Sequence, residues 1–454
     1  MSTIFAPITS INQGGVCVIR ISGARSLDCL NKLGIDRSKI LPQKTTFQKI
    51  IDLKNKEIID ECLVTYFKEP LSFTGEDVIE ISIHASNYIF HKISNILRDI
   101  EDIRFAEAGE FSKRAFFNNK IGLIEAEAIP DLIASETEMQ HKQAIKQLSG
   151  KVGQVYDNLR LDIINVLALI NAAIDFPDDD LPEDIIKSVN SDIENIKNII
   201  KNIINDGRLG QKIKNGLSLA IIGEPNVGKS TLINFLANSE IAIVSDIAGT
   251  TRDVIEAHLD IAGVPVKIAD TAGIRHSKDK IEQEGVRRAF KEARISDIKI
   301  LVLDAKNPKI SDQIIELIDK ETVIIANKID EIDNFNQESL DKLSKNSPHL
   351  APFLKNIIKI SLKNKINLDL LISSIEQQVK NQIPSQNSAI ITKERHRDCL
   401  KLALNYIEDF SLNKPIEIAA EDLRLAAQEI AQITGKIDVE NILDVIFSSF
   451  CIGK

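Results

Sequence analysis

Residues 223–230, GEPNVGKS, restrict the fold of this chain more than any other segment. They follow an apolar, strand-like stretch, LSLAII, and lead into a helix-like one, STLINFLAN. GxxxxGKS between a strand and a helix is typical of a phosphate-binding loop, in which backbone N–H groups surround the phosphates. In such a loop Lys229 adds a positive charge and the Ser230 hydroxyl can bind magnesium. A chance glycine-rich turn is the alternative, and two further motifs weigh against it.

Both further motifs stand where a predicted strand ends. In DTAG, after VKIA, Asp270 can support the magnesium ion. In NKID, after TVIIA, the Asp330 carboxylate can accept two hydrogen bonds from guanine that adenine cannot offer. These motifs, with SLK after another strand, predict a GTP-binding domain. The predicted contacts are Asn226, Val227, Gly228, Lys229, Ser230, Thr231, Asp270, Thr271, Ala272, Gly273, Asn327, Lys328, Asp330 and Ser361.

The residues that would catalyse GTP hydrolysis differ from those of small regulatory GTPases. Small regulatory GTPases carry a glutamine directly after DTAG to orient the attacking water, and this chain has Ile274 there. The segment AIVSDIAGTTRD, residues 242–253, occupies the place of the switch loop, and Thr251 is its predicted magnesium ligand. Glu282, in KIEQEG, is a candidate for positioning water, and an exposed helix glutamate is the alternative. Further GTP contacts are predicted at Ser245, Asp246, Ile247, Ala248, Gly249, Thr250 and Thr251.

Asn226 and GTTRD resemble the potassium-activated GTPases. There an asparagine side chain and loop carbonyls hold a potassium ion where other GTPases insert an arginine finger, which raises the rate by about 10³ to 10⁵. A plain loop spacer is the alternative for Asn226.

The rest of the chain predicts a multidomain α/β plus α fold. Residues 1–118 carry strand-like runs, GGVCVIRISG, CLVTYF and VIEISIH, typical of an α+β domain. Residues 119–215 show helical apolar periodicity around the acidic loop DFPDDDLPED. Strands and helix-length segments alternate over residues 216–379, which predicts a parallel-rich sheet covered on both faces. Residues 380–454 are helical again, so the phosphate-binding domain is inserted into a discontinuous helical domain.

Composition excludes several classes of protein. The net charge of -10 argues against non-specific coating of nucleic acid. Five cysteines without a CxxC pair exclude a disulfide framework and a zinc ribbon, and they fit a reducing compartment. No apolar stretch is long enough to span a bilayer, and MSTIFAPITS lacks the features of a secretory signal. We therefore expect a cytoplasmic protein that does not enter a membrane.

Several segments together resemble one family, the MnmE (TrmE) GTPases of tRNA modification. They are SFTGEDVIEI near residue 75, GEFSKRAFFNNKIGLIEAEAI from Gly109, the phosphate-binding loop, AIVSDIAGTTRD, DTAGIR and the final FSSFCIGK. A C-terminal CxGK tail joined to such a loop is very specific. The resemblance implies an N-terminal folate-binding domain that dimerises, a helical domain in two segments and an inserted GTPase domain.

The same resemblance implies a function. A homodimer would act with the FAD-carrying flavoprotein MnmG, in a heterotetramer, on carbon 5 of the wobble uridine U34 of certain tRNAs. The products would be 5-aminomethyl or 5-carboxymethylaminomethyl uridines, with 5,10-methylene- or 5-formyl-tetrahydrofolate as one-carbon donor. GTP hydrolysis would need Mg²⁺ on Ser230 and Thr251, with Glu282 as catalytic residue. The implied K⁺ ligands are Asn226, Ser245, Ile247 and Thr250.

Four positions match folate contacts of the family: Arg20, Glu80, Lys120 and Lys454. A carboxylate suits the amide and amines of a reduced pterin, and basic groups suit the carboxylates of its glutamate tail. From the residues alone, Arg20 and Lys120 would be surface charges. Cys451 resembles a nucleophile near the folate, and an incidental tail cysteine is the alternative.

The chain departs from the family pattern at several places, of which two affect the backbone most directly. His84-Ala85-Ser86 stands where HGG is common, so backbone freedom beside the predicted pocket is reduced. Pro130 lies inside a predicted helix and should kink it.

Contact with RNA rests on two basic segments, residues 393–397 and 201–214, for which a solvated helix face is the alternative. The rival function is a potassium-dependent ribosome-assembly GTPase that binds rRNA. Such proteins usually add a KH-like domain or a second GTPase domain, and neither signature is evident in the sequence. A dynamin-type scaffold is disfavoured because no basic amphipathic membrane helix is evident.

Overall fold

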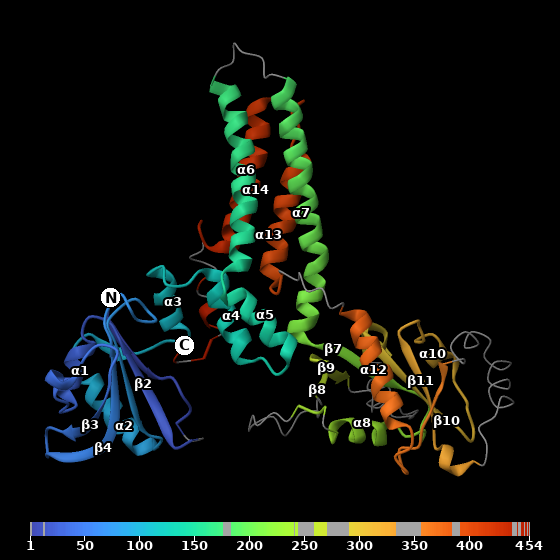
Figure 1. Ribbon diagram of the computed structural model, residues 1–454, viewed down its shortest axis with the longest axis horizontal. Helices are drawn as coiled ribbons and strands as arrows, with labels where there is room; N and C mark the ends of the chain where they lie inside the picture. The colour runs from blue at the N-terminus through green and yellow to red at the C-terminus, as the bar shows by residue number, and fades with distance from the viewer. Residues whose placement is uncertain are drawn as a thin grey trace, which may run out of the picture. The chain divides into compact units, whose positions relative to one another are not determined.

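The computed structural model describes residues 2–11, 14–175, 183–239, 241–243, 258–269, 290–332, 356–383 and 391–437, with residues 443, 446–448, 450, 451 and 453 near the C-terminus. The chain forms two compact units (Figure 1). The first unit contains Met1–Pro130, Ile145–Asn198 and Asp398–Lys454. The second unit contains Asp131–Ala144 and Ile199–Arg397.

The first unit begins with a six-stranded sheet. Its strands are β1 (Thr3–Pro7), β2 (Val16–Ser22), β3 (Thr45–Asp52), β4 (Glu57–Phe67), β5 (Val78–His84) and β6 (Ile103–Phe105). They lie in the order β3-β4-β5-β2-β1-β6, with β1 and β6 parallel and the other neighbours antiparallel. The connections contain helices α1 (Ser26–Lys32), α2 (Asn87–Arg98) and α3 (Glu110–Phe117) and the 3₁₀ turn η1 (Arg37–Lys39).

The two faces of this sheet differ because successive side chains of a strand point to opposite sides. One face is a continuous core that includes Ile19, Ile81 and residues of α1 and α2. The other face is covered by α3 only beside β1, where Phe111 packs on Ile4 and Ala6. Toward β3 and β4 this second face is exposed and mixed in character: Phe47 and Leu63 lie between a Thr45–Thr65 hydrogen bond and a Lys49–Glu61 ion pair.

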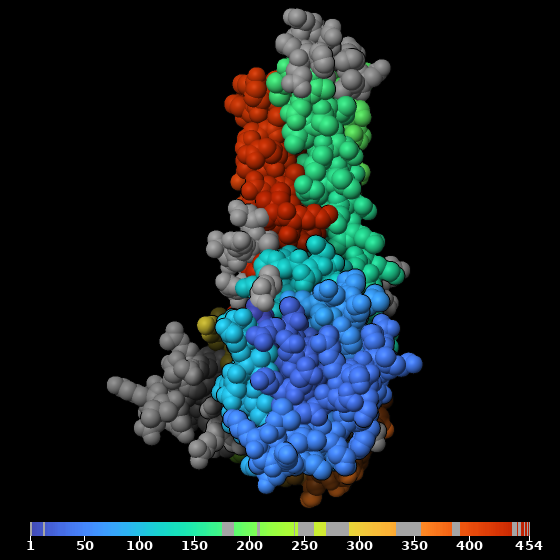
Figure 2. All heavy atoms as spheres, turned by 90° about the vertical axis from the view of Figure 1, so that its left-hand side faces the viewer, coloured from blue at the N-terminus to red at the C-terminus, as the bar shows by residue number. Residues whose placement is uncertain are grey.

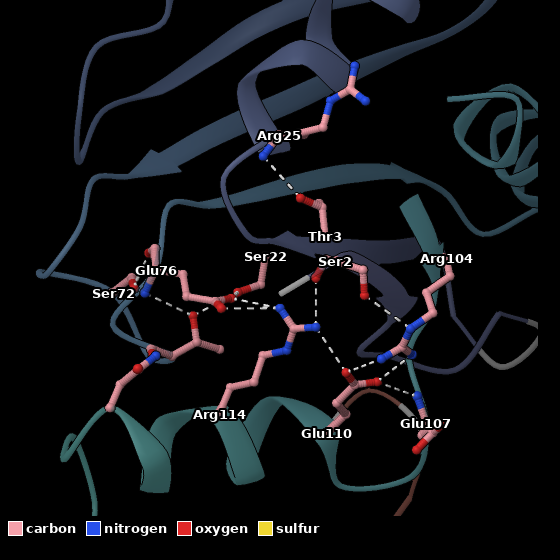
Figure 3. Close-up of polar contacts among 12 residues, drawn as sticks. Ser2, Thr3, Ser22, Arg25, Ser72, Glu76, Arg104, Glu107, Glu110 and Arg114 are labelled. Atoms are coloured by element: carbon pink, nitrogen blue, oxygen red, sulfur yellow. Dashed lines mark hydrogen bonds and ion pairs between the residues drawn. The ribbon is translucent and has the colours of Figure 1, made fainter. Parts of the chain in front are cut away.

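A buried network of charged side chains fixes α3 to the sheet (Figure 3). Arg114, with 6% of its side chain exposed, donates to Glu76 at 3.1 Å and to Glu110 at 2.9 Å. Glu110 also accepts hydrogen bonds of 2.6 and 2.8 Å from Arg104, and Glu76 accepts one of 2.6 Å from Ser22. Buried charges are tolerated when they are paired and hydrogen-bonded in this way. The network therefore holds the loop before β5 against α3.

Helices from both sides of the insertion form the split helical region, whose residues are divided between the two units. The helices of the split region are α4 (Leu123–Ile133), α5 (Glu138–Leu148), α6 (Lys151–Asp175), α7 (Glu183–Asn215), α13 (Glu394–Asp409) and α14 (Ile416–Thr434). Helix α6 packs along α14, and the C-terminal helices (red in Figure 2) lie alongside those that precede the insertion (green). Pro130 lies within α4, as predicted. No helix in the described ranges is long and apolar enough to cross a membrane.

The C-terminal segment returns to the N-terminal region. Phe447 and Phe450 pack on Leu123 of α4, with their ring centroids 5.4 Å apart. Gly453 lies against the backbone of Pro7, at the end of β1. The two ends of the first unit are therefore neighbours.

The second unit contains another six-stranded sheet. Its strands are β7 (Leu217–Ile222), β8 (His258–Ile261), β9 (Val264–Ala269), β10 (Ile298–Asp304), β11 (Thr322–Asn327) and β12 (Ile358–Lys359). Their order is β12-β11-β10-β7-β9-β8, and every neighbouring pair is parallel except β8 with β9. The other elements are α8 (Lys229–Ala237), α10 (Asp312–Ile315), α12 (Leu368–Gln382) and the 3₁₀ turn η2 (Ile329–Glu331).

Both faces of this sheet are buried, as expected for parallel strands. Leu219 and Ile221 point to one face, where residues of α8 and α12 cover them. Ala220 and Ile222 point to the other, which Ile314 of α10 helps to cover. The predicted fold class is confirmed: an α+β region, a helical region from both sides of an insertion, and an inserted parallel-rich α/β domain.

Three lysines of the predicted RNA-contacting segments take part in ion pairs within the second unit. Asp131 of α4 pairs with Lys214 of α7 at 3.0 Å and with Lys393, which precedes α13, at 3.2 Å. Lys212 pairs with Asp297 at 2.8 Å. These lysines are therefore not merely solvated charges of a helix face, and RNA contact by the two segments stays a prediction.

Candidate functional site

The phosphate-binding loop leaves β7 and enters α8, as its motif predicts. Lys229 Nζ donates 2.8 Å hydrogen bonds to the carbonyls of Gly223 and Glu224. Gly228 has φ +111°, and a Cβ there would clash with the side-chain amide of Asn327. Only glycine accepts this conformation readily, so the loop can lie directly on the NKID motif.

Asn327 joins the phosphate-binding loop to the SLK loop. Its Nδ2 donates to the Val227 carbonyl at 2.9 Å, and its Oδ1 accepts from the Leu362 N–H at 3.2 Å. The side chains of Val227 and Asn327 are buried. These two hydrogen bonds fix the phosphate-binding loop and the SLK loop relative to each other.

Asp330 is oriented from behind by a buried hydroxyl. Ser361 Oγ donates to Asp330 Oδ1 at 2.6 Å and accepts from the Asn364 N–H at 3.0 Å. Ser361 is fully buried, whereas Asp330 lines the pocket. Within the described residues the second carboxylate oxygen of Asp330 has no protein partner, which leaves it available to the edge of a guanine.

A pocket of about 560 Å³ lies between these loops, within the range of small-molecule sites. Eight of the predicted GTP contacts line it: Asn226, Gly228, Lys229, Ser230, Thr231, Asn327, Lys328 and Asp330. Val227 and Ser361 do not line it, and they support the pocket from behind through the bonds just described. The lining also includes Leu362 and Lys363 of the SLK motif, and Pro225, Ile233 and Glu331, which are not among the predicted contacts.

The remaining predicted residues of this site lie outside the described part of the chain. They are Ser245, Asp246, Ile247, Ala248, Gly249, Thr250, Thr251, Asp270, Thr271, Ala272, Gly273 and Glu282. Lys454, predicted at the folate site, also lies outside it. Their roles stay predictions.

A second cluster of predicted residues lies on the sheet of the first unit. Arg20 of β2 and Glu80 of β5 are register partners, and Arg20 NH2 lies 2.8 Å from Glu80 Oε1. The Arg20 guanidinium also lies 5.2 Å from the ring centroid of Phe73 and 5.5 Å from that of Phe111. Less than a quarter of either charged side chain is exposed, at 17% and 24%, so neither is a simple surface charge.

Lys120 and the C-terminal tail approach the same region. Lys120 Nζ donates to the Pro70 carbonyl at 2.8 Å, on the loop that also carries Phe73. Ala6, the register partner of Arg20, precedes Pro7, against which Gly453 lies. The described part of the tail therefore reaches β1, the strand that neighbours β2 and Arg20 in the sheet.

Burial decides which of the cysteine thiols solvent and ligands can reach. Four of the five free cysteines are buried and Cys451 is exposed. Burial raises the pKa of Cys29 and of Cys62 to about 12 in each case, so these thiols stay protonated. Cys451 is the accessible thiol of the set.

Sequence reasoning missed three side chains around these sites. Phe73 and Phe111 belong to no motif that the sequence indicates, and only the fold shows that they flank Arg20. Asp304 ends β10 and forms a 2.6 Å ion pair with Lys328 of NKID. The sequence gives only a weak indication of this role for Asp304, which is a carboxylate at the end of the predicted strand that precedes the NKID strand.

The fold and the nucleotide pocket define a P-loop GTPase: a phosphate-binding loop and the NKID motif meet at the carboxyl edge of a parallel sheet. The chain belongs to the MnmE family of tRNA modification GTPases. The family model for the MnmE helical domain matches residues 123–451, and the model for the GTP-binding protein TrmE N-terminus matches residues 3–120.

Relatives support this assignment over the full length. The tRNA modification GTPases MnmE of Rickettsia akari and Rickettsia typhi are each 46% identical over 457 residues, with 100% of both chains covered. Among solved structures, Aquifex aeolicus Era bound to GDP and AlF4- is 26% identical over 42% of this chain and 66% of Era, with a TM-score of 0.29. The assignment stands on the family models and the sequence relatives.

Proposed function

We propose that this GTPase couples GTP hydrolysis to modification of the wobble uridine of tRNA at carbon 5. The observation that carries the proposal is the 46% identity to tRNA modification GTPases over the whole chain. The flavoprotein MnmG would supply FAD in a joint complex, and a tetrahydrofolate would supply the one-carbon unit. The tRNA substrate makes the cytoplasm the expected location.

Nucleotide chemistry is assigned to the pocket of the second unit. Asp330 would read guanine, and Lys229 with the loop N–H groups would hold the phosphates. Ser230 lies in the first turn of α8 and lines the pocket, so its hydroxyl suits Mg²⁺, with Thr251 as the second protein ligand. Mg²⁺ would neutralise charge that develops on the phosphates.

Potassium is assigned to the Asn226 side chain. Asn226 lines the pocket, and its amide has no hydrogen-bond partner among the described residues, which fits a group held ready for a cation. Ser245, Ile247 and Thr250 would complete the site, and Glu282 would position water. A bound K⁺ would supply the positive charge that an arginine finger supplies elsewhere.

The folate is assigned to the region around Arg20 and Glu80. The carboxylate, guanidinium and two flanking phenyl rings are groups that suit a flat, hydrogen-bonding pterin. Lys120 and Lys454 would meet the glutamate carboxylates, and the exposed Cys451 would lie near the one-carbon unit. The domain boundaries 1–118, 119–215, 216–379 and 380–454 are proposed with these roles.

A homodimer is supported by the open face of the N-terminal sheet. Phe47 of β3 and Leu63 of β4 are register partners on that face, 61% and 46% exposed. Adjacent exposed apolar side chains of this size mark a surface that gains from being covered. Sedimentation of wild type and of Phe47→Ser/Leu63→Ser would show whether this face forms the dimer.

Nucleoside analysis of tRNA from a deletion strain tests the proposed function. Loss of 5-carboxymethylaminomethyl-type uridines, restored by wild type and not by Asp330→Ala, supports tRNA modification. Normal tRNA with a defect in ribosome subunits would favour the rival, an rRNA-binding assembly GTPase.

A further inference from the structure

Asp304 belongs to none of the GTPase motifs, yet it contacts Lys328 of NKID, which in turn contacts the phosphate-binding loop. It is the last residue of β10, directly beside Asn327 in the parallel register of β10 with β11. Its Oδ2 lies 2.6 Å from Lys328 Nζ, and its Oδ1 accepts from the Lys306 N–H at 2.9 Å. Both carboxylate oxygens are therefore occupied, and the side chain has one defined orientation.

Lys328 extends this chain of contacts to the phosphate-binding loop. Its Nζ donates to the Asn226 carbonyl at 2.7 Å while it pairs with Asp304. Lys328 has φ +66° and Asn226 has φ +63°, so both ends of this bridge adopt the left-handed conformation that non-glycine residues seldom take. Such a conformation persists when surrounding contacts fix it, and the bridge supplies one of those contacts.

The ion pair is better sheltered than an ordinary surface pair. The side chains of Lys328 and Asp304 are 29% and 20% exposed. Burial raises the pKa of Asp304, but the Lys328 ammonium and the backbone N–H groups of Lys306 and Asn307 together hold it below its usual value. The Asp304 carboxylate is thus charged at neutral pH. It fixes the position of the Lys328 ammonium, which is carried on a flexible four-carbon stem.

We propose that Asp304 is a positioning residue for the nucleotide site. By fixing the Lys328 ammonium over the Asn226 carbonyl, it holds the Lys328 stem as a wall of the purine pocket and keeps Asn226 in its loop conformation. The first consequence concerns nucleotide affinity and rests on the GTPase pocket alone. The second concerns the potassium requirement of Asn226 and rests on the proposed function.

Nucleotide binding by the full-length chain is the primary test, with fluorescent mant-GDP as the probe in Mg²⁺ buffer. We expect Asp304→Ala to bind about tenfold more weakly, Asp304→Asn to lose less, and Asp304→Glu to recover most of the affinity, because a charged hydrogen bond is stronger than a neutral one. Most of the change should appear as faster release. Asp304→Ala combined with Lys328→Met should be no weaker than Lys328→Met alone, because Asp304 acts through that lysine.

Asp319 offers a matched control on the same sheet. It pairs with Lys299 of β10 and accepts a 3.0 Å bond from the Glu321 N–H, as Asp304 does with its own lysine and backbone. It does not line the pocket. Asp319→Asn should leave mant-GDP affinity within about twofold. Equal weakening by Asp319→Asn, or an additive double variant, would show that loss of general stability causes the effect and would overturn the proposal.

The potassium consequence separates this proposal from the proposed function. In GTPase assays at saturating GTP, Asp304→Ala should raise the K⁺ concentration for half-maximal rate several-fold, about three to ten times, and leave the rate at saturating K⁺ close to wild type. If wild type shows no potassium stimulation, the K⁺ assignment fails while the nucleotide-affinity result still decides the role of Asp304. If wild type is stimulated and Asp304→Ala has an unchanged requirement, the link from Asp304 to Asn226 is refuted.

Discussion

Ser361 Oγ donates a 2.6 Å hydrogen bond to Oδ1 of Asp330 from a position with no exposed surface. The Asp330 carboxylate is thus oriented by a residue that does not line the pocket. Because the same hydroxyl accepts from the Asn364 N–H, the SLK loop holds the donor in place. Under the proposed role of Asp330, guanine recognition depends on a residue behind the pocket as well as on one inside it.

Ser361→Ala should weaken GTP binding by about tenfold, because it removes a bond to a charged oxygen. Titration calorimetry with GDP and GTP measures the change. Asp330→Asn is the companion variant: it should lose at least about 100-fold in affinity for GTP and prefer XTP, whose base offers an acceptor where guanine has its amine. Unchanged selectivity in Asp330→Asn would exclude this carboxylate as the reader of the base.

GTP hydrolysis should be faster in potassium than in sodium at equal ionic strength, by about tenfold or more, because a cation near Asn226 takes over the role of a finger. Asn226→Ala removes the amide but also puts a Cβ-bearing residue with weak αL preference at φ +63°. Asn226→Gly removes the amide without that strain, so it is the cleaner variant. Both should lose the stimulation. Equal wild-type rates in the two salts would leave Glu282 or a partner protein to supply catalysis.

Arg114→Met should destabilise the first unit by about 3 kcal/mol, because it leaves the largely buried Glu76 without a cation and leaves Glu110 with Arg104 alone. Urea unfolding of the full-length chain, followed by circular dichroism, measures the loss. Arg424→Met removes the exposed i,i+3 pair with Glu421 and should have no measurable effect. Equal behaviour of the two variants would mean that the Arg114 network is not structural.

Acid should unfold the wild type more steeply than Glu110→Gln. Burial raises the pKa of Glu110, but Arg104, the Glu107 N–H and Arg114 together hold it below its usual value. The stabilisation is present above the unfolded-state pKa, near 4.3, and is lost as pH falls through the lower folded-state pKa, so removing the group flattens the curve. Glu429→Gln is a control of opposite sign, because burial raises the pKa of Glu429 and its loss should steepen the fall. Melting temperatures between pH 6 and about pH 3 decide between these outcomes.

The nucleotide pocket could be predicted from the sequence because each of its motifs is a short continuous segment. GxxxxGKS and NKID each hold their functional residues within a few positions, at the ends of β-branched strands. Strand β8 is harder to foresee, because HLDI is short and pairs antiparallel at the edge of an otherwise parallel sheet. Strand β3, TTFQKIID, is mostly polar and has an exposed face, so it lacks the buried run that identifies its neighbours.

Ion pairs between residues far apart in the chain could not be predicted from the sequence. Lys214 and Lys393 read as parts of basic helix faces, yet both reach Asp131 of α4. Arg114 reads as one polar residue of an amphipathic helix, and only the packing of α3 on the sheet buries it beside Glu76. A periodic pattern gives the side of a helix on which a residue lies but not the carboxylate that approaches it from another element.

Gly453→Ala tests whether the C-terminal tail belongs to the proposed folate site. Gly453 has φ +101°, and a Cβ would clash with the Pro7 carbonyl, so alanine should lift the tail from β1. We expect tetrahydrofolate affinity, measured by calorimetry, to fall at least about tenfold, while GTP affinity stays unchanged because its pocket lies in the second unit. Gly153→Ala is the control: no atom outside its own helix lies within 4 Å of a Cβ there, and alanine favours a helix. If Gly453→Ala binds tetrahydrofolate as wild type does, the tail, with Cys451 and Lys454, does not contribute to folate binding.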